Sequence, residues 1–371
     1  MANMLDYVRD CGRLRFGEIG FTALDNLVLS QLSYVDYAAA GSSLPLRLDQ
    51  LEGRVRYGVM NENNKSLFHL AASSPRFSGS LAAFYRSDFS REDTCQFAAV
   101  TFLLEDGSAF VSFRGTDSTL VGWKEDFMLS FTTPVPAQLA AVQYANEVGE
   151  VLGCPLRLGG HSKGGNLAVY AAAFCQKTVQ DKIVQVYSND GPGFEQQVLQ
   201  SVGYLNIRSR VRRYLPEASM VGMLMDSDSE VCVVKSTGHG PFRHNPYTWQ
   251  VQGSAFVPGR SETFTSHMVL SSQKDWFASL SREKRETYTD LLFDILFAGN
   301  ARTMKELRSD PAKIVSAARA IAKLPPEDRK NLTEFGKQVL SSLYAGGSTA
   351  AKQRYETVLE AVRAKIGLSG E

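Results

Sequence analysis

A serine flanked by glycines joins two short apolar runs near the middle of the chain. The sequence there reads "PLRLGGHSKGGNLAVYAA" over residues 155–172, with Ser162 at its centre. The residues before the glycines have the pattern of a short strand, and the small apolar residues after them predict a helix buried on most sides. A chain that passes from strand to helix within so few residues needs a tight turn, which glycine permits. This feature therefore predicts a layered α/β fold.

The segments around this turn alternate between strand-like and helix-like patterns. Residues 95–117 hold two β-rich runs around an Asp-Gly pair, which is a strong hairpin signal. Residues 136–153 begin with proline, keep helical periodicity and end in glycine, which indicates a helix. Strands are expected over 183–187, 208–215 and 229–237. This order predicts a mainly parallel sheet with helices on both faces.

The two ends of the chain are predicted to be helical. Residues 21–37 have apolar side chains at helical spacing, and from about Ser271 the sequence becomes charged and lacks strand signals. Four helical stretches, separated by Gly, Pro or Asn, are expected there. We therefore expect an α/β domain over residues 1–270 and a helical C-terminal domain or cap over residues 271–371.

The composition narrows the class of protein and of partner. The chain has 371 residues, is 44% hydrophobic and carries a net charge of +1, so no long-range field favours nucleic acid or an anionic membrane. Its five cysteines are scattered and form no C-x-x-C pair, which predicts neither a disulfide framework nor a zinc site. The sequence has no signal peptide and no apolar run of membrane-spanning length. We expect a cytoplasmic protein without integral membrane contact.

The glycine-flanked serine also has the pattern of an activated nucleophile. Residues 160–164 match G-x-S-x-G, in which glycines allow the strained turn that lifts a serine above the sheet. The following helix would direct its free N–H groups and positive dipole end at the same place. The alternative is an ordinary serine in a glycine-rich loop, but the strand before it and the helix after it favour a nucleophile at Ser162.

A serine nucleophile needs a histidine base and an acid that orients the base. Three later histidines qualify, and we favour His244, in a loop after a predicted strand, over His239 and His267. His161 is too close to the serine in sequence to act as base, and a structural hydrogen bond is its expected role.

For the acid we favour Asp190, which directly follows a predicted strand, with Glu217 as the alternative. Asp190 could instead bond the backbone of its own turn. Backbone N–H groups of Thr116, after an early strand, and of Lys163, after the nucleophile, are the candidate oxyanion donors. No metal or organic cofactor is needed, because such a triad generates its own nucleophile.

These motifs together resemble a known family. "VSFRGTD" and "GGHSKGGNLA", followed by a later histidine, are similar to motifs of the class 3 (fungal-type) lipases. The chain is more similar to a bacterial group of lipase-like α/β hydrolases, the Mbeg1-like family, in six ordered motifs spanning roughly residues 20–255. The motifs are "LDNLVLSQLSYVDY", "FRGTD", "GGHSKGGNLAVYAA", "YSNDGPGF", "PEASMVGML" and "RHNPYTWQV".

The resemblance implies a lipase-like α/β-hydrolase fold for residues 1–270 and a triad of Ser162, Asp190 and His244. Two features depart from class 3 lipases. Those enzymes usually have leucine where Lys163 stands, which implies a more polar oxyanion side here. Their acid generally comes later in the chain, where Glu217 occupies a similar place here. Asp190 and Glu217 therefore both remain candidates for the acid of the triad.

The function hypothesis is a serine hydrolase that cleaves carboxylic esters, of lipids, lysolipids or other small acyl compounds, through an acyl-enzyme. A thioesterase or acyltransferase would use the same triad, and only the leaving group and acceptor would differ. The hypothesis from another class is a non-catalytic, hydrolase-like interaction protein, whose sign would be a broken triad. The C-terminal helices are a candidate cap or a candidate surface for homo-oligomers.

Overall fold

The computed structural model describes residues 1–260 except 59 and 220, residues 280–298, and a few positions between 301 and 332. The chain forms two compact units. The first consists of Met1–Asp117 and Pro134–Glu262, and the second of Ser118–Thr133 and Thr263–Glu371. The expected division at residue 270 falls outside the described residues.

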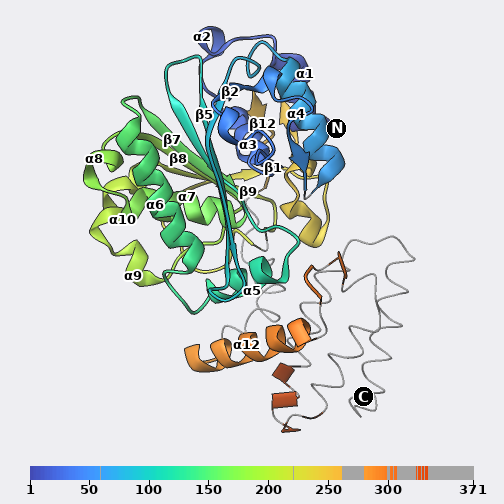
Figure 1. Cartoon of the computed structure of the whole chain (residues 1–371), viewed down its shortest axis with the longest axis vertical. Helices are drawn as coiled ribbons and strands as arrows, with labels where there is room; N and C mark the ends of the chain where they lie inside the picture. The colour runs from blue at the N-terminus through green and yellow to red at the C-terminus, as the bar shows by residue number, and fades with distance from the viewer. Residues whose placement is uncertain are drawn as a thin grey trace. The chain divides into compact units, whose positions relative to one another are not determined.

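An eight-stranded sheet forms the centre of the first unit, in the order β10-β9-β8-β7-β6-β5-β4-β2 (Figure 1). Strands β6 to β10 run parallel to one another, and β5, β4 and β2 continue the sheet in antiparallel pairs. The strands of this sheet are β2 (Leu46–Arg47), β4 (Leu81–Ser90), β5 (Cys95–Leu103), β6 (Ala109–Phe113), β7 (Leu156–His161), β8 (Ile183–Asn189), β9 (Val211–Pro216) and β10 (Glu230–Val234). The expected mainly parallel sheet and the expected hairpin are confirmed.

Two short two-stranded sheets lie outside the main sheet. Strand β1 (Val35–Asp36) pairs with β3 (Arg56–Tyr57), and β11 (Val251–Gln252) pairs with β12 (Ala255–Phe256). These pairs, and β4 in the main sheet, were not expected from the sequence. In β4 the pairing register shifts between Ala83 and Arg86, and Phe84 between them has φ +52°, so a bulge interrupts the alternation of inward and outward side chains.

Helices cover both faces of the sheet, as expected (Figure 1). One face carries α6, α7 and α10, and the other carries α1, α3 and α4. The helices of this unit are α1 (Met4–Cys11), α2 (Phe16–Ile19), α3 (Ala23–Leu32), α4 (Asn61–Ser73), α6 (Pro136–Val151), α7 (Lys163–Phe174), α8 (Lys177–Gln180), α9 (Gln196–Leu199) and α10 (Val202–Ile207). The expected helices at residues 21–37, at 136–153 and after Ser162 correspond to α3, α6 and α7.

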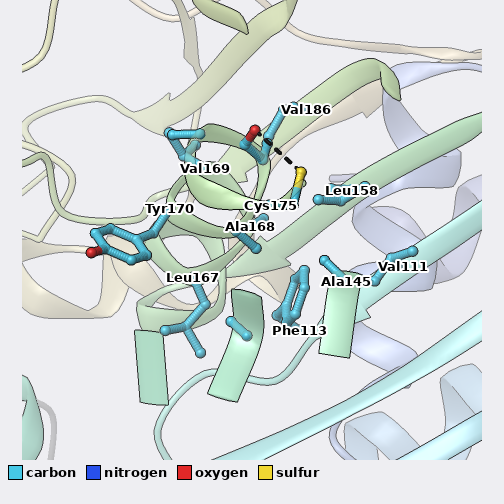
Figure 2. Close-up of a cluster of buried hydrophobic side chains, with 14 of the residues drawn as sticks. Val111, Phe113, Ala145, Leu158, Leu167, Ala168, Val169, Tyr170, Cys175 and Val186 are labelled. Carbon is cyan, nitrogen blue, oxygen red and sulfur yellow. Dashed lines mark hydrogen bonds between the residues drawn. The ribbon is translucent and has the colours of Figure 1, made fainter. Parts of the chain in front are cut away.

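Alternate side chains of each strand point to opposite faces of the sheet, so the sheet has a hydrophobic core on each face. Along β6, Val111 and Phe113 face the core under α6 and α7, while Phe110, directly before Val111, faces the core under α3. Figure 2 shows the first core, where Val111 and Phe113 lie opposite Leu167 and Ala168 of α7. Because both faces are covered, the functional edge of the sheet is held between two packed layers.

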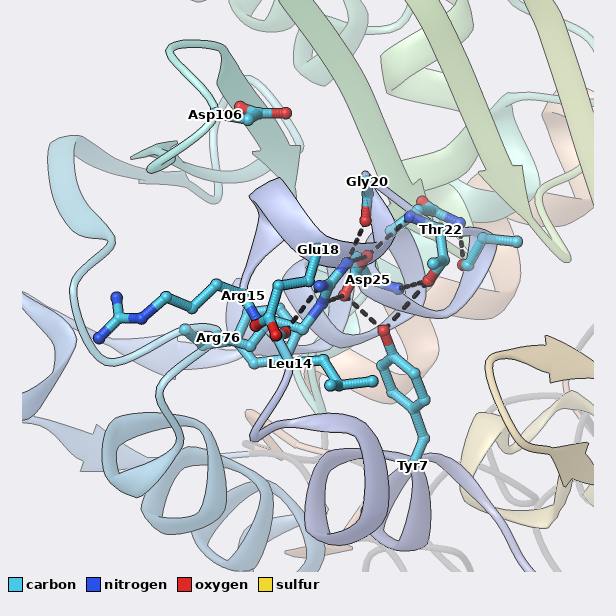
Figure 3. Close-up of polar contacts among 12 residues, drawn as sticks. Tyr7, Leu14, Arg15, Glu18, Gly20, Thr22, Asp25, Arg76 and Asp106 are labelled. Atoms are coloured by element: carbon cyan, nitrogen blue, oxygen red, sulfur yellow. Dashed lines mark hydrogen bonds and ion pairs between the residues drawn. The ribbon is translucent and has the colours of Figure 1, made fainter.

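A buried ion pair fastens the N-terminal segment to the rest of the first unit (Figure 3). Arg76 and Asp25 are both fully buried, and the Nε of Arg76 donates to Asp25 Oδ1 at 2.7 Å. Tyr7 donates to the same oxygen at 2.7 Å, and the guanidinium also reaches the carbonyls of Leu14 and Gly20. The Asp25 carboxylate at the start of α3 thus binds Tyr7 and Arg76, and Arg76 in turn binds two loop carbonyls of the N-terminal region.

The second unit joins a segment from the middle of the chain to the C-terminal part. Helix α5 (Leu120–Met128) packs against α12 (Arg282–Ala298), the described part of the expected helical region. Phe127 and Phe293 lie 5.9 Å apart between ring centroids, and Lys124 pairs with Asp290 at 2.7 Å. The other expected helices, at 310–324, 325–345 and 348–367, lie wholly or largely outside the described residues.

None of the helices in the described part of the chain combines the length and the apolar character that crossing a membrane requires.

Candidate active site

Ser162 lies on a strained turn directly between β7 and α7. Its backbone has φ +59° and ψ −133°, a region that residues with a side chain rarely adopt. The turn can be this tight because residue 164 is glycine: a Cβ there would lie 2.1 Å from the Phe113 carbonyl oxygen. The Ser162 N–H donates to the carbonyl of Asn189 at 2.9 Å. The serine is thus held at the carboxyl edge of the parallel strands, with its side chain partly exposed.

His244 and Asp190 form a hydrogen-bonded pair at the same edge. The distance from His244 Nδ1 to Asp190 Oδ2 is 2.6 Å, with the histidine side chain 26% exposed and the carboxylate 1% exposed. The other oxygen of Asp190 accepts the N–H of Gly222 at 3.1 Å and the hydroxyl of Ser219. A carboxylate so held accepts a hydrogen bond from the Nδ1–H group, which leaves Nε2 as the basic nitrogen of the ring.

His161 lies against His244 and fixes its backbone. The two ring centroids are 4.6 Å apart, and His161 Nε2 lies 2.8 Å from the carbonyl oxygen of His244. Since a carbonyl only accepts, Nε2 carries the proton and Nδ1 accepts from the hydroxyl of Tyr34 at 3.2 Å. Burial, followed by the neighbouring His244, lowers the pKa of His161 from 6.5 to about 3. His161 is therefore neutral. Its hydrogen bond to the His244 carbonyl is a structural contact that holds the loop carrying His244.

The candidate oxyanion loop follows β6 and packs on the serine turn. A Cβ at Gly115 would lie 2.5 Å from the carbonyl oxygen of His161 and 3.2 Å from Ser162 Cβ, so only glycine allows this approach. Thr116 and Lys163, the two candidate donors, therefore belong to segments that touch each other beside Ser162. Their roles as donors remain a prediction.

The side chain of Lys163 corrects one expectation. It is buried, and its ammonium group donates to the carbonyl and to the side-chain oxygen of Gln96, at 2.9 and 3.0 Å. Because this charge is withdrawn from solvent and bonded to β5, it does not make the surface of a pocket more polar.

The alternative acid and base lie in other surroundings. A carboxylate oxygen of Glu217 accepts the backbone N–H of Arg260 at 2.8 Å, and its own backbone carbonyl accepts from Arg243. His239 is exposed at the start of the short helix η4 (Gly240–His244). The pair that the structure brings together is Asp190 with His244. His267 lies outside the described residues.

Sequence reasoning missed the residues that support the turn from the N-terminal region. Asn26 of α3 exchanges two side-chain hydrogen bonds with Asn189, at 2.9 and 3.0 Å, and Asn189 also donates to the carbonyl of Gly160 at 3.1 Å. Ser30 lies one turn later and accepts from Asn189 at 3.2 Å. Polar residues spaced by four on an otherwise apolar helix were a usable signal, because a buried polar stripe needs partners.

In the described residues, no group of three or more His, Cys, Asp or Glu side chains lies close enough to hold a metal ion.

The model of one protein family, described as Mbeg1-like, matches residues 71–294, which is more than half of the chain. The chain belongs to the Mbeg1-like family. The match includes Ser162, Asp190 and His244, and begins after Asn26, Ser30 and Tyr34, so these three supporting residues lie outside it.

Solved structures similar to this Mbeg1-like chain include two lipases. M37 lipase is 14% identical, with a TM-score of 0.34, over 53% of this chain and 68% of that chain. The native propeptide complex of Rhizomucor miehei lipase is 14% identical, with a TM-score of 0.36, over 57% of this chain and 67% of that chain. No curated protein matches the sequence.

Proposed function

We propose that this protein is a serine hydrolase that cleaves carboxylic esters through an acyl-enzyme. Ser162 is the nucleophile, His244 the general base and acid, and Asp190 the group that orients His244. The observation that carries the proposal is the 2.6 Å bond between His244 Nδ1 and a fully buried Asp190, in a chain whose Ser162 occupies a strained strand-to-helix turn. Strain and buried charge are costly, and they are typical of sites where chemistry takes place.

The first half of the reaction forms the acyl-enzyme. Ser162 Oγ attacks the carbonyl carbon of the ester while His244 Nε2 takes the serine proton, and the carbonyl electron pair moves to oxygen. The tetrahedral intermediate collapses, the bond to the alcohol breaks, and the leaving oxygen receives the proton from Nε2. Asp190 stabilises the imidazolium that exists between these two proton transfers.

The second half releases the acid. Water attacks the acyl carbon, His244 takes its proton and returns it to Ser162 Oγ, and the carboxylic acid leaves. Backbone N–H groups of Thr116 and Lys163 stabilise the negative oxygen in both halves. A thioester would pass through the same steps with a thiolate leaving group, so matched oxygen and sulfur esters distinguish an esterase from a thioesterase.

The test is labelling of the purified protein with a fluorophosphonate, followed by turnover of p-nitrophenyl esters of increasing chain length. We expect wild-type protein to gain one label on Ser162, and the Ser162→Ala and His244→Ala variants to gain none. His239→Ala is the matched control, because this exposed histidine lies on the same loop, and it should label like wild type. A folded wild-type protein that neither labels nor hydrolyses any ester would favour the non-catalytic alternative.

A further inference from the structure

The residue that follows the candidate nucleophile is a buried lysine. Lys163 is 1% exposed, and its ammonium group donates to both oxygens of Gln96, the backbone carbonyl at 2.9 Å and the side-chain oxygen at 3.0 Å. Removing an ammonium group from water is costly even when it is well bonded, and an apolar side chain of similar length would avoid that cost. Stability alone therefore gives little reason for a lysine at this position.

Gln96 connects this lysine to the candidate oxyanion loop. Its side-chain oxygen, the one that accepts from Lys163, also accepts the backbone N–H of Asp117 at 3.3 Å. Gln96 is buried on β5 and cannot move without disturbing that strand. One amide oxygen thus joins the residue after Ser162 to the residue after Thr116.

Thr116 is fixed on its other side as well. The Arg114 N–H donates to the Ala98 carbonyl at 2.9 Å and extends the pairing of β6 with β5, and Gly115 packs on the serine turn. Residues 114–117 form neither helix nor strand, so these contacts and the Gln96 bond contribute to the direction of the Thr116 N–H. The Gln96 bond is the one among them that depends on the side chain of Lys163.

We propose that Lys163 and Gln96 are positioning residues. They hold the two candidate oxyanion donors, the backbone N–H groups of Thr116 and Lys163, in a fixed position relative to each other. The inference rests on the proposed function. The backbone of Lys163 supplies one donor, and its side chain, acting through Gln96, fixes the loop that supplies the other. To stabilise an oxyanion, both N–H groups must point at the same oxygen with hydrogen-bond geometry. A small displacement of the loop therefore reduces the stabilisation of the transition state more than it reduces the affinity for the substrate.

The first test is Lys163→Met, which keeps the length of the side chain and removes its charge. Since loss of a whole donor costs about 10²–10³-fold, a displaced donor should lower kcat about tenfold and leave KM unchanged. The affinity for a trifluoromethyl ketone, which forms an oxyanion with the serine, should fall by the same factor. The affinity for the matching alcohol, which forms none, should not change.

Lys182→Met is the control, because the Lys182 ammonium group, like that of Lys163, donates to two oxygens, here the backbone carbonyls of Gly149 and Leu152, at 2.7 and 3.1 Å. It should leave all these quantities unchanged. Wild-type kcat in Lys163→Met would overturn the inference, and so would equal losses of affinity for ketone and alcohol, which indicate general damage to the pocket.

The second test does not depend on activity. Backbone hydrogen exchange over residues 115–117 should be faster in Lys163→Met than in wild type, at an unchanged free energy of unfolding by urea. Unchanged exchange overturns the inference even if the protein hydrolyses esters. If the wild-type protein has no activity but exchange is still faster in Lys163→Met than in wild type, then Lys163 holds the loop. The oxyanion role and the proposed function are then both wrong.

Discussion

Asp190 combines complete burial with a left-handed backbone, φ +52°, directly after β8. Its carboxylate accepts from Gly222 and Ser219 on one oxygen and from His244 on the other, so its bonds set the tautomer of the histidine. We expect Asp190→Asn to lower kcat by about 10³–10⁴-fold, because an amide in this place stabilises the wrong tautomer. Glu217→Gln is the control and should stay within about threefold of wild type, since that carboxylate bonds a backbone N–H elsewhere. The reverse ranking in ester turnover would move the acid to Glu217.

His161 predicts a dependence of stability on pH. Burial, followed by the neighbouring His244, lowers the pKa of His161 from 6.5 to about 3 in the folded protein. Between these values the unfolded chain binds a proton that the folded chain does not, so the free energy of unfolding falls as the pH falls from about 6.5 toward 3. His161→Phe should therefore show a shallower loss of stability between pH 6.5 and the acid limit of folding. Urea titrations at several pH values measure this, and equal slopes in both proteins would contradict it.

At the scale of the element, α3 links the N-terminal region to the candidate site. Asp25 in its first turn forms the buried ion pair with Arg76 (Figure 3). The next residue, Asn26, bonds Asn189, whose carbonyl accepts the N–H of Ser162. We expect Arg76→Met to lower the free energy of unfolding by about 3–5 kcal/mol, because it leaves a carboxylate buried without its cation. Adding Asp25→Leu should recover part of that loss, although the helix then also loses the side chain that caps its first turn. Urea unfolding measures both, and a double variant less stable than Arg76→Met would refute this account.

At the scale of the whole molecule, the second unit is discontinuous in sequence. Because α5 packs on α12 through Phe127 and Lys124, a chain that ends at residue 262 keeps α5 but loses its partner. We expect trypsin to cut after Lys124 much faster in that shortened chain than in the full chain, where the lysine side chain is only 13% exposed. Cleavage after Lys182, in the first unit, is the internal control and should not change. Equal cleavage after Lys124 in both chains would show that α5 does not depend on α12.

Much of this architecture could be predicted from local sequence patterns. Strand and helix periods, the Asp-Gly turn and the proline and glycine at the ends of α6 act over a few residues, so they predicted β5 to β10, α3, α6 and α7. The same reasoning located Ser162 and Asp190 after β7 and β8, because the carboxyl ends of parallel strands meet at one edge. It missed β4, where a bulge breaks the alternation, and the pairing of α5 with α12, which lie far apart in the chain.

What the sequence determined by itself was the order of elements and the residue types at the edge of the sheet. Only the tertiary structure decided which of these residues meet: Asp190 rather than Glu217 lies against His244, and Lys163 turns inward to Gln96. The physical reason is the distance along the chain over which each kind of interaction acts. Backbone propensity and side-chain period act between near neighbours, whereas a hydrogen bond between residues 54 or 67 positions apart depends on how the packed layers bring those segments together.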